Sequence, residues 1–141
     1  MQVFIVGTPY ETAQALDAKR LHKQIVECNQ ILDALNGAQA WSNHPCVLQY
    51  REHECWLMHY RDCLAFYQRG YRNLASIESF YAVDCYPIFW HTQDYYDQMK
   101  RRLYTKNNTH YAQWAHLGKS DENWYFVDGV WRKYINGKRI E

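Results

Sequence analysis

The chain has 141 residues, a length that most simply makes one domain with a real hydrophobic core. Its 48% hydrophobic content argues against disorder, no run of about 18 apolar residues suggests a membrane span, and a net charge of +1 gives no global basic signal for nucleic acid. The aromatic content is high, with 13 Tyr, 6 Trp and 5 Phe, which suits either a Tyr-rich core or a core that opens onto a stacking surface.

Charge is spread unevenly along the chain. Residues 1–90 hold 7 Lys and Arg against 9 Asp and Glu, whereas residues 91–141 hold 9 against 6. The carboxy-terminal third is therefore the better candidate for contact with phosphate groups.

The five cysteines and seven histidines show no spacing typical of a metal site. There is no Cys-x-x-Cys pair, and several cysteines fall on apolar helical faces, so we expect reduced, buried thiols and no metal. The opening residues Met1–Val6 are too short and too uncharged for a signal peptide, which predicts a cytoplasmic protein.

Hydrophobic periodicity and turn residues predict a mostly α, compact single domain over residues 1–141, with about three main helices and a small C-terminal β-hairpin within residues 118–141. A first helix is expected from residue 11 or 12 to about 36, and a second from about 45 or 50 to 68. An irregular stretch around residues 84–87 leads to a third helix at about 92–104. Asp128-Gly129, between two aromatic and β-prone runs, predicts a two-residue hairpin turn.

The first predicted helix carries a polar stripe beside its apolar one. Apolar residues recur with helical spacing at positions 21, 25, 28, 32 and 35, and the adjoining stripe holds Arg20, Lys23, Gln24, Glu27 and Gln30. Glu27 could simply pair with Lys23 one turn earlier. An amine and a carboxylate together can also perform imine chemistry on a sugar aldehyde carbon, so Glu27 and the α-amine of Met1 form the candidate catalytic pair.

Several motifs resemble one known family. Leu16-Asp17, Arg20-Leu21 and Glu27 resemble the first-helix pattern of the phage pyrimidine-dimer DNA glycosylases, the small UV-repair enzymes called endonuclease V in phage. Three later segments resemble the same family and its bacterial relatives: an Asn-His-Pro loop (41–45), a second helix ending Arg-Gly-aromatic (60–71) and a late helix that begins with His and carries spaced basic residues (91–106). The resemblance covers about residues 10 to 115 at low identity, and the order and spacing of the motifs carry it.

The family's aromatic-basic tail, of the form Trp-x-Lys-Tyr-x-Gly-Lys, has two candidate matches. Residues 111–119 are favoured by their distance from His91, and residues 131–138 are favoured by residue identity. Both matches stay open at this point.

The resemblance implies a mostly helical monomer that acts on duplex DNA, away from membranes, without metal or cofactor, in a bacterial or phage-infected cell. In this family the α-amine of the mature amino terminus attacks C1′ of the damaged nucleotide and forms an imine. A helix carboxylate, which maps onto Glu27, assists the sugar chemistry and the β-elimination that nicks the strand. An α-amine has an ordinary pKa of about 8, so a neutral fraction exists at pH 7, whereas a lysine at about 10.4 needs strong depression first. Such chemistry also requires a base displaced from the stack.

The chain departs from the family pattern at two positions. The best-known members expose Thr after removal of Met, whereas here residue 2 is Gln, whose bulk normally prevents that removal. The nucleophile is then the α-amine of Met1, or the lyase step is absent and Glu27 activates water instead. Val26 stands where the best-known enzyme has Arg, so recognition of a pyrimidine dimer does not follow, and the lesion or modified pyrimidine is open.

The residues expected to contact DNA are Arg20, Lys23, Gln24, Gln30, His44, Arg69, His91, Lys100, Arg101 and Lys106. Each has a structural alternative. The basic residues can form a solvated face, His44 can fix its loop, Arg69 can cap a helix and His91 can pack. Trp131 and Tyr134 can pack within the hairpin or stack on a base.

Three functions are compatible with these features. The first is a DNA glycosylase, with or without AP-lyase activity, that excises a pyrimidine dimer or a modified pyrimidine. The second is a non-catalytic DNA-binding or protein-interaction module that retains the fold, which the small net charge and the bulky residue 2 favour. The third is an enzyme that acts on a nucleoside or nucleotide outside DNA.

Overall fold

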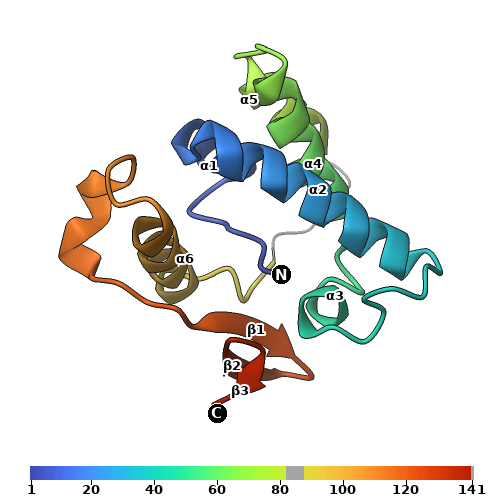
Figure 1. Cartoon of the computed structure of the whole chain (residues 1–141). Helices are drawn as coiled ribbons and strands as arrows, with labels where there is room; N and C mark the ends of the chain where they lie inside the picture. The colour runs from blue at the N-terminus through green and yellow to red at the C-terminus, as the bar shows by residue number, and fades with distance from the viewer. Residues whose placement is uncertain (82–87, 141) are drawn as a thin grey trace.

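The computed structural model describes residues 1–81 and 88–140, with the side chains of 78–81 excepted. Over these ranges the chain is mostly helical with a small three-stranded antiparallel sheet near its carboxy terminus (Figure 1). The elements in chain order are α1 (Pro9–Ala15), α2 (Ala18–Leu35), α3 (Pro45–Gln49), α4 (Glu54–Gln68), α5 (Leu74–Tyr81), α6 (Gln93–Lys106), the 3₁₀ helix η1 (Ala112–Leu117), β1 (Asn123–Val127), β2 (Val130–Ile135) and β3 (Lys138–Arg139).

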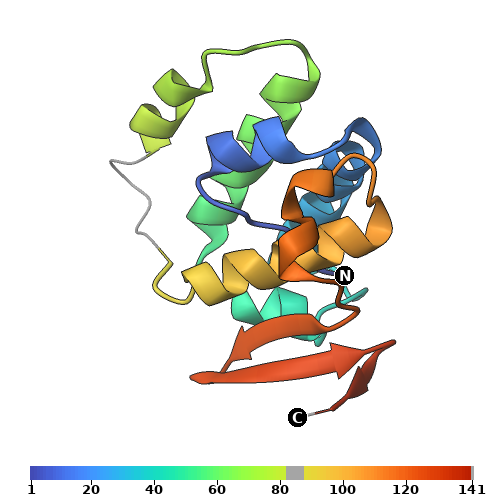
Figure 2. The same cartoon turned by 90° about the vertical axis from the view of Figure 1, so that its left-hand side faces the viewer.

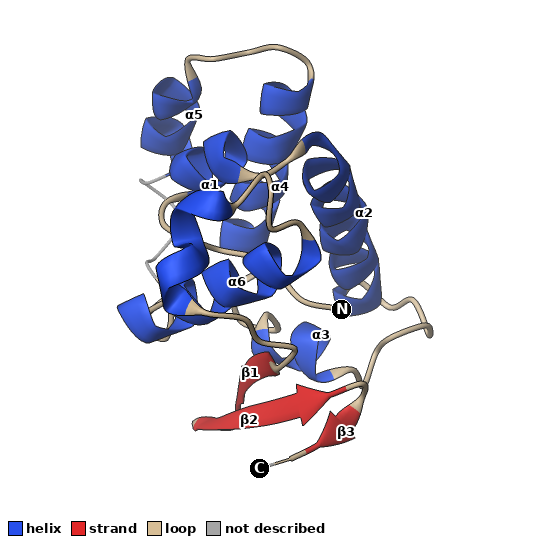
Figure 3. Ribbon diagram, turned by 60° about the vertical axis from the view of Figure 1, so that its left-hand side comes forward, coloured by secondary structure: helices blue, strands red, loops and turns tan. Residues whose placement is uncertain are grey.

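The helices form the body of the molecule and the sheet lies beneath them (Figures 2 and 3). Helix α2 packs along α4, and the sheet joins the body where β1 packs on α3. The strands follow the order β1-β2-β3, and Val127 pairs with Val130 across the turn at Asp128 and Gly129. Among the described helices, none is long and apolar enough to span a bilayer.

The mostly helical fold with a carboxy-terminal hairpin is confirmed, but the predicted first helix is in fact two helices. Leu16 and Asp17 both have extended backbone angles, with ψ of 140° and 159°. Asp17 exchanges hydrogen bonds with Tyr111, since its N–H donates to the Tyr111 hydroxyl over 2.9 Å and that hydroxyl donates to its carboxylate. This contact spans 94 residues of sequence, so helical periodicity around position 17 could not reveal the break.

The predicted second helix is likewise divided, into α3 and α4, by a turn at residues 50–53. Helix α5 and strand β3 are additions that the sequence patterns do not predict, and the irregular stretch predicted at residues 84–87 lies outside the described residues. Three cysteines are free and buried as expected: Cys28, Cys46 and Cys63. Cys55 is disulfide-bonded, so the expectation of a reduced thiol is wrong there.

The outer edge of β1 is paired by side chains instead of by another strand. Gln2 makes a two-point contact with Trp124, accepting from its N–H over 3.0 Å and donating to its carbonyl over 3.1 Å. The next outward-facing groups along the edge are paired in the same way by two further buried glutamines. Gln49 accepts from the Phe126 N–H over 3.0 Å, and Gln98 donates to the Glu122 carbonyl over 2.9 Å. Since an amide side chain carries both a donor and an acceptor, it can replace a peptide group at a strand edge.

His91 is enclosed by aromatic rings at the start of α6. Its ring lies 4.4 Å from Trp90 and 4.7 Å from Trp56, centroid to centroid, and stacks on Tyr95 at 5.5 Å. Its Nε2 is 3.2 Å from the Tyr50 hydroxyl. Burial lowers the pKa of His91 to about 3, so the imidazole is neutral at physiological pH.

Acid should therefore destabilise the protein through His91. Below a pH of about 6.5 the unfolded chain takes up a proton at this residue while the folded protein does not, until the pH approaches about 3. We expect His91→Phe to remove that proton uptake and to reduce the slope of unfolding free energy against pH, between pH 6 and 4, by about 1.4 kcal/mol per pH unit. Urea denaturation at several pH values measures the slope, and parallel curves for the two proteins would contradict the assignment.

Candidate active site

The first five residues run as an extended segment through the middle of the helices, and their backbone is held mainly by side chains (Figure 1). Gln24 of α2 is at the centre of this arrangement and is fully buried. Its carbonyl oxygen accepts from the Phe4 N–H over 2.8 Å and from the Tyr60 hydroxyl over 3.2 Å. Its amide nitrogen donates to the Gln2 carbonyl and to the Glu27 carboxylate, both over 2.9 Å. Gln24 thereby ties the amino-terminal segment to Glu27.

Tyrosine hydroxyls from three other elements complete the pairing of this segment. Tyr60 of α4 donates to the Phe4 carbonyl over 2.8 Å, and Tyr95 of α6 donates to the Val3 carbonyl over 2.7 Å. Tyr125 of β1 donates a short hydrogen bond to the Met1 carbonyl. Since buried tyrosines need a partner for their hydroxyl, each of these contacts fixes the segment as well as filling the core.

The peptide group between Met1 and Gln2 is held on both sides. Tyr125 donates to its carbonyl, and its N–H lies near the Glu27 carboxylate, where it lowers the pKa of that group. The α-amine of Met1 is therefore fixed close to Glu27, and the charges of the two groups influence each other. Within the described residues the two do not form an ion pair, and Met1 lines a cavity.

The pKa of Glu27 is raised above its ordinary value. Desolvation by burial is the largest cause, and the α-ammonium group, the Gln2 N–H and Arg20 oppose it. A carboxyl group whose pKa is moved upwards toward neutral pH can both accept and return a proton under physiological conditions.

His44 lies near the amine, at the start of α3. Its Nδ1 accepts from the Cys46 N–H over 3.1 Å as the cap of that helix, which places the ring proton on Nε2 when the imidazole is neutral. Its pKa is lowered by burial and by the neighbouring α-ammonium group. His44 is thus a neutral hydrogen-bond donor at pH 7.

Positive side chains from α2 and α6 surround Glu27. We define the basic cluster as Arg20, Lys23, Arg102 and Lys106. The guanidinium groups of Arg20 and Arg102 lie 5.7 and 5.8 Å from the centre of the Phe4 ring. The pKa of Lys106 is lowered to about 8 by desolvation and then by Arg102 and Arg20, and Glu27 opposes this shift. Such a cluster is suited to contact with the phosphates on either side of a nucleotide held at Glu27.

The structure separates the sequence-predicted site residues into two groups. Arg20, Lys23 and Lys106 lie around Glu27, His44 lies beside Met1, and Gln30 is exposed one turn after Glu27 on α2. Gln24 is buried beneath the site and donates to Glu27. The other four have contacts elsewhere: His91 is packed among rings, Arg69 caps α4 above Phe66, Lys100 lies over Trp114, and Arg101 donates to the Leu117 carbonyl.

Sequence reasoning missed the residues that position the amine. The apolar stripe of the predicted second helix includes Tyr60, and no pattern marks Gln2, Tyr95 or Tyr125. The tyrosines themselves are a signal, because a buried tyrosine, unlike a phenylalanine, requires a hydrogen-bond partner for its hydroxyl group. The identity of that partner, an unpaired amino-terminal segment, could not be read from spacing.

Removal of the Gln24 amide should destabilise the whole protein. In Gln24→Leu the buried Phe4 N–H and Gln2 carbonyl lose their partner, and we expect a loss of about 2–4 kcal/mol of unfolding free energy in urea denaturation. Gln30→Leu, at an exposed position of the same helix, is the matched control and should change it by less than about 0.5 kcal/mol. Equal effects of the two substitutions would show that Gln24 does not hold the segment.

Comparison with known proteins gives one match, to a family model. No curated protein and no solved structure matches the chain. The family model described as "Pyrimidine dimer DNA glycosylase" matches residues 1–66, which include Met1, Gln24, Glu27, His44 and Tyr60. The resemblance seen in the sequence is therefore confirmed for residues 1–66, the part of the chain that matches the pyrimidine dimer DNA glycosylase family.

Proposed function

We propose that this protein is a DNA glycosylase with lyase activity that uses the α-amine of Met1 as nucleophile and Glu27 as the assisting carboxylate. The observation that carries the proposal is the clamped Met1–Gln2 peptide group, which fixes the amine beside a carboxyl group of raised pKa. The basic cluster supports a DNA substrate, since it supplies positive charge on two helices around the same carboxylate.

The proposed reaction begins at C1′ of the target nucleotide. The neutral amine forms a bond to C1′ while the glycosidic bond breaks and the base leaves with a proton. Opening of the sugar ring breaks the C1′–O4′ bond and converts the adduct to an imine, as the remaining amine proton is transferred to the ring oxygen. Removal of a C2′ proton then expels the 3′ phosphate, and water hydrolyses the imine to release the enzyme.

Glu27 has two roles in this sequence of steps. As a carboxylate it stabilises the positive charge that develops on the sugar, and with its raised pKa it can carry protons between the amine, the ring oxygen and C2′. His44, as a neutral donor beside the amine, does not compete for those protons at pH 7.

The decisive test is borohydride trapping on duplex oligonucleotides that carry an abasic site or a panel of lesions. We expect a covalent adduct that mass spectrometry locates at Met1. Base release without an adduct would instead indicate a glycosylase that uses water. Neither adduct nor release across the panel would refute the proposal and favour the non-catalytic binding module.

Glu27→Gln should abolish turnover without harming the fold. We expect at least a 100-fold loss of activity on abasic DNA, in line with the roughly 10²–10⁴-fold effects of proton-transfer groups. The pKa of Glu27 is higher in the folded protein than in the unfolded chain. The folded state therefore loses stability as the pH rises through this pKa and the carboxyl group ionises. The unfolding free energy at pH 7 should therefore be equal to or higher than that of the native protein.

The control for this variant is Asp33→Asn, which removes an exposed carboxylate from the same helix. It should leave turnover unchanged. Full activity of Glu27→Gln would eliminate the assigned role of this carboxylate.

Lys106 should make duplex binding dependent on both salt and pH. As one phosphate contact, it should contribute about 0.9 to the slope of log K against log salt, which Lys106→Met removes. Native binding should also weaken as the pH rises through about 8, since Lys106 then loses its charge. Lys106→Arg should retain binding at pH 9.

Fluorescence anisotropy with a labelled duplex measures both effects. Lys100→Met, which changes a lysine of the same helix that lies over Trp114, should leave the salt slope unchanged. An unchanged slope in Lys106→Met would remove this residue from the DNA contact.

A further inference from the structure

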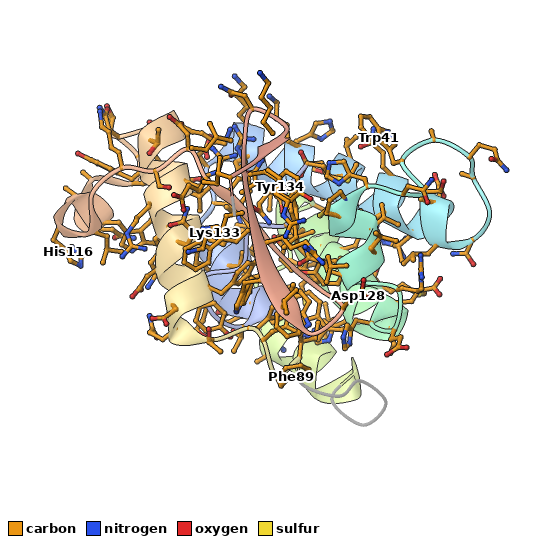
Figure 4. All side chains as sticks on the ribbon, turned by 90° about the horizontal axis from the view of Figure 1, so that it is seen from below. Trp41, Phe89, His116, Asp128, Lys133 and Tyr134 are labelled. Atoms are coloured by element: carbon orange, nitrogen blue, oxygen red, sulfur yellow. The ribbon has the colours of Figure 1, made fainter. Side chains whose placement is uncertain are left out.

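A cavity of about 240 Å³ opens directly beside the amino terminus. Met1 forms part of its wall, and the remaining lining residues are His44, Pro45, Asn123, Tyr125, Tyr134 and Gly137. Four of these come from the carboxy-terminal sheet and its turn, outside the residues 1–66 that match the family. The sheet therefore adds to the matched part of the chain a wall that faces the α-amine (Figure 4, where Tyr134 is labelled on the sheet).

The size of the cavity limits what it can hold. Pockets for drug-sized ligands have volumes of about 300–1,000 Å³, so a volume of about 240 Å³ suits one small ring system. Two covalently linked bases, each with its own sugar, are larger than one such ring system. The cavity thus fits a single nucleobase.

The aromatic lining is suited to a flat ligand. Tyr125 is buried, and its ring meets those of His44 and Tyr134 at centroid distances of 5.6 and 5.5 Å, with interplanar angles of 88° and 62°. Tyr134 is only partly buried and is the outer wall of the group. Stacking on an aromatic side chain is the usual way in which proteins hold a base that has left the duplex.

Two polar side chains of the cavity, His44 and Asn123, present hydrogen-bond donors. His44 accepts at Nδ1 from the Cys46 N–H, which leaves Nε2–H as its donor. Asn123 accepts at Oδ1 from Arg102, over 3.1 and 2.7 Å, which leaves its amide N–H groups. Donors complement the carbonyl oxygens of an oxidised, reduced or deaminated pyrimidine.

The same asparagine connects the cavity to the basic cluster. Arg102 contacts Asn123 and also lies over Phe4, next to Glu27. A nucleotide whose base occupies the cavity would therefore have its sugar near Met1 and its flanking phosphates near the basic cluster.

We propose that this cavity receives one carbonyl-bearing pyrimidine turned out of the duplex, with Tyr134 as its stacking wall, so that the protein excises single-base lesions in preference to linked pyrimidine pairs. This proposal rests on the proposed glycosylase function. It differs from that function in naming the target base and the side chains that select it.

The test compares three duplexes: one with a single 5,6-dihydrouracil, one with a cyclobutane thymine dimer and one with a preformed abasic site. We expect base release from dihydrouracil at least 10-fold faster than from the dimer. Tyr134→Ala should reduce dihydrouracil release by roughly 5- to 150-fold, the range of one lost stacking contact, and change abasic-site trapping by less than about 3-fold. Tyr134→Phe should retain most of the release, since the ring remains.

Ile135→Ala is the matched control, because the next residue of β2 points to the other face of the sheet. It should leave the ratio of dihydrouracil release to abasic-site trapping unchanged. Faster release from the dimer, or equal losses of Tyr134→Ala on dihydrouracil and abasic DNA, would overturn the proposal.

A binding measurement separates this proposal from the catalytic one. 2-Aminopurine placed next to the dihydrouracil brightens when its neighbour leaves the stack, and it reports this without any chemical step. We expect brightening with the native protein and with Glu27→Gln, but not with Tyr134→Ala. Brightening without trapping on abasic DNA would retain the cavity and refute the lyase. Trapping without brightening would retain the lyase and refute the cavity.

Discussion

The structure depends on the pairing of backbone groups that have no strand beside them. Both the amino-terminal segment and the outer edge of β1 are extended, lie against the core and must satisfy their peptide groups away from water. Side-chain amides and phenols provide the partners, which are Gln24 and three tyrosines for the first segment, and Gln2, Gln49 and Gln98 for the second. Replacing any of these side chains with an apolar one of equal size would leave a buried polar group unsatisfied.

This pairing also determines the chemistry of the site. The amine of a free chain end is ordinarily mobile, because terminal residues have few contacts. Here the Tyr125 hydroxyl and the Glu27 carboxylate lie on the two sides of the first peptide group, and the burial of this arrangement also desolvates Glu27. The raised pKa of the carboxyl group and the fixed position of the amine thus have one cause. Because the carboxylate is held in an unfavourable environment, its ionisation lowers the stability of the fold.

Local sequence patterns predicted the features that local chemistry decides. The polar stripe around Glu27, the turn at Asp128 and Gly129 and the course of α6 all follow from spacing and turn preference within a few residues. Features decided by distant contacts could not be obtained in this way. The break at Asp17 depends on Tyr111, and the position of Gln24 depends on a segment 20 residues earlier in the chain. Spacing put Gln24 and Lys23 on the same stripe, yet one is fully buried and the other is exposed.

The contact between Gln2 and Trp124 has a consequence for how the molecule is made. It joins residues 122 positions apart, so the side chain of Gln2 has this partner only after residue 124 has been synthesised. Long-range contacts of this kind slow folding, because a large loop must close before they contribute. A growing chain would therefore carry Glu27 and its helix long before the carboxy-terminal sheet is available to hold the amino-terminal segment beside it.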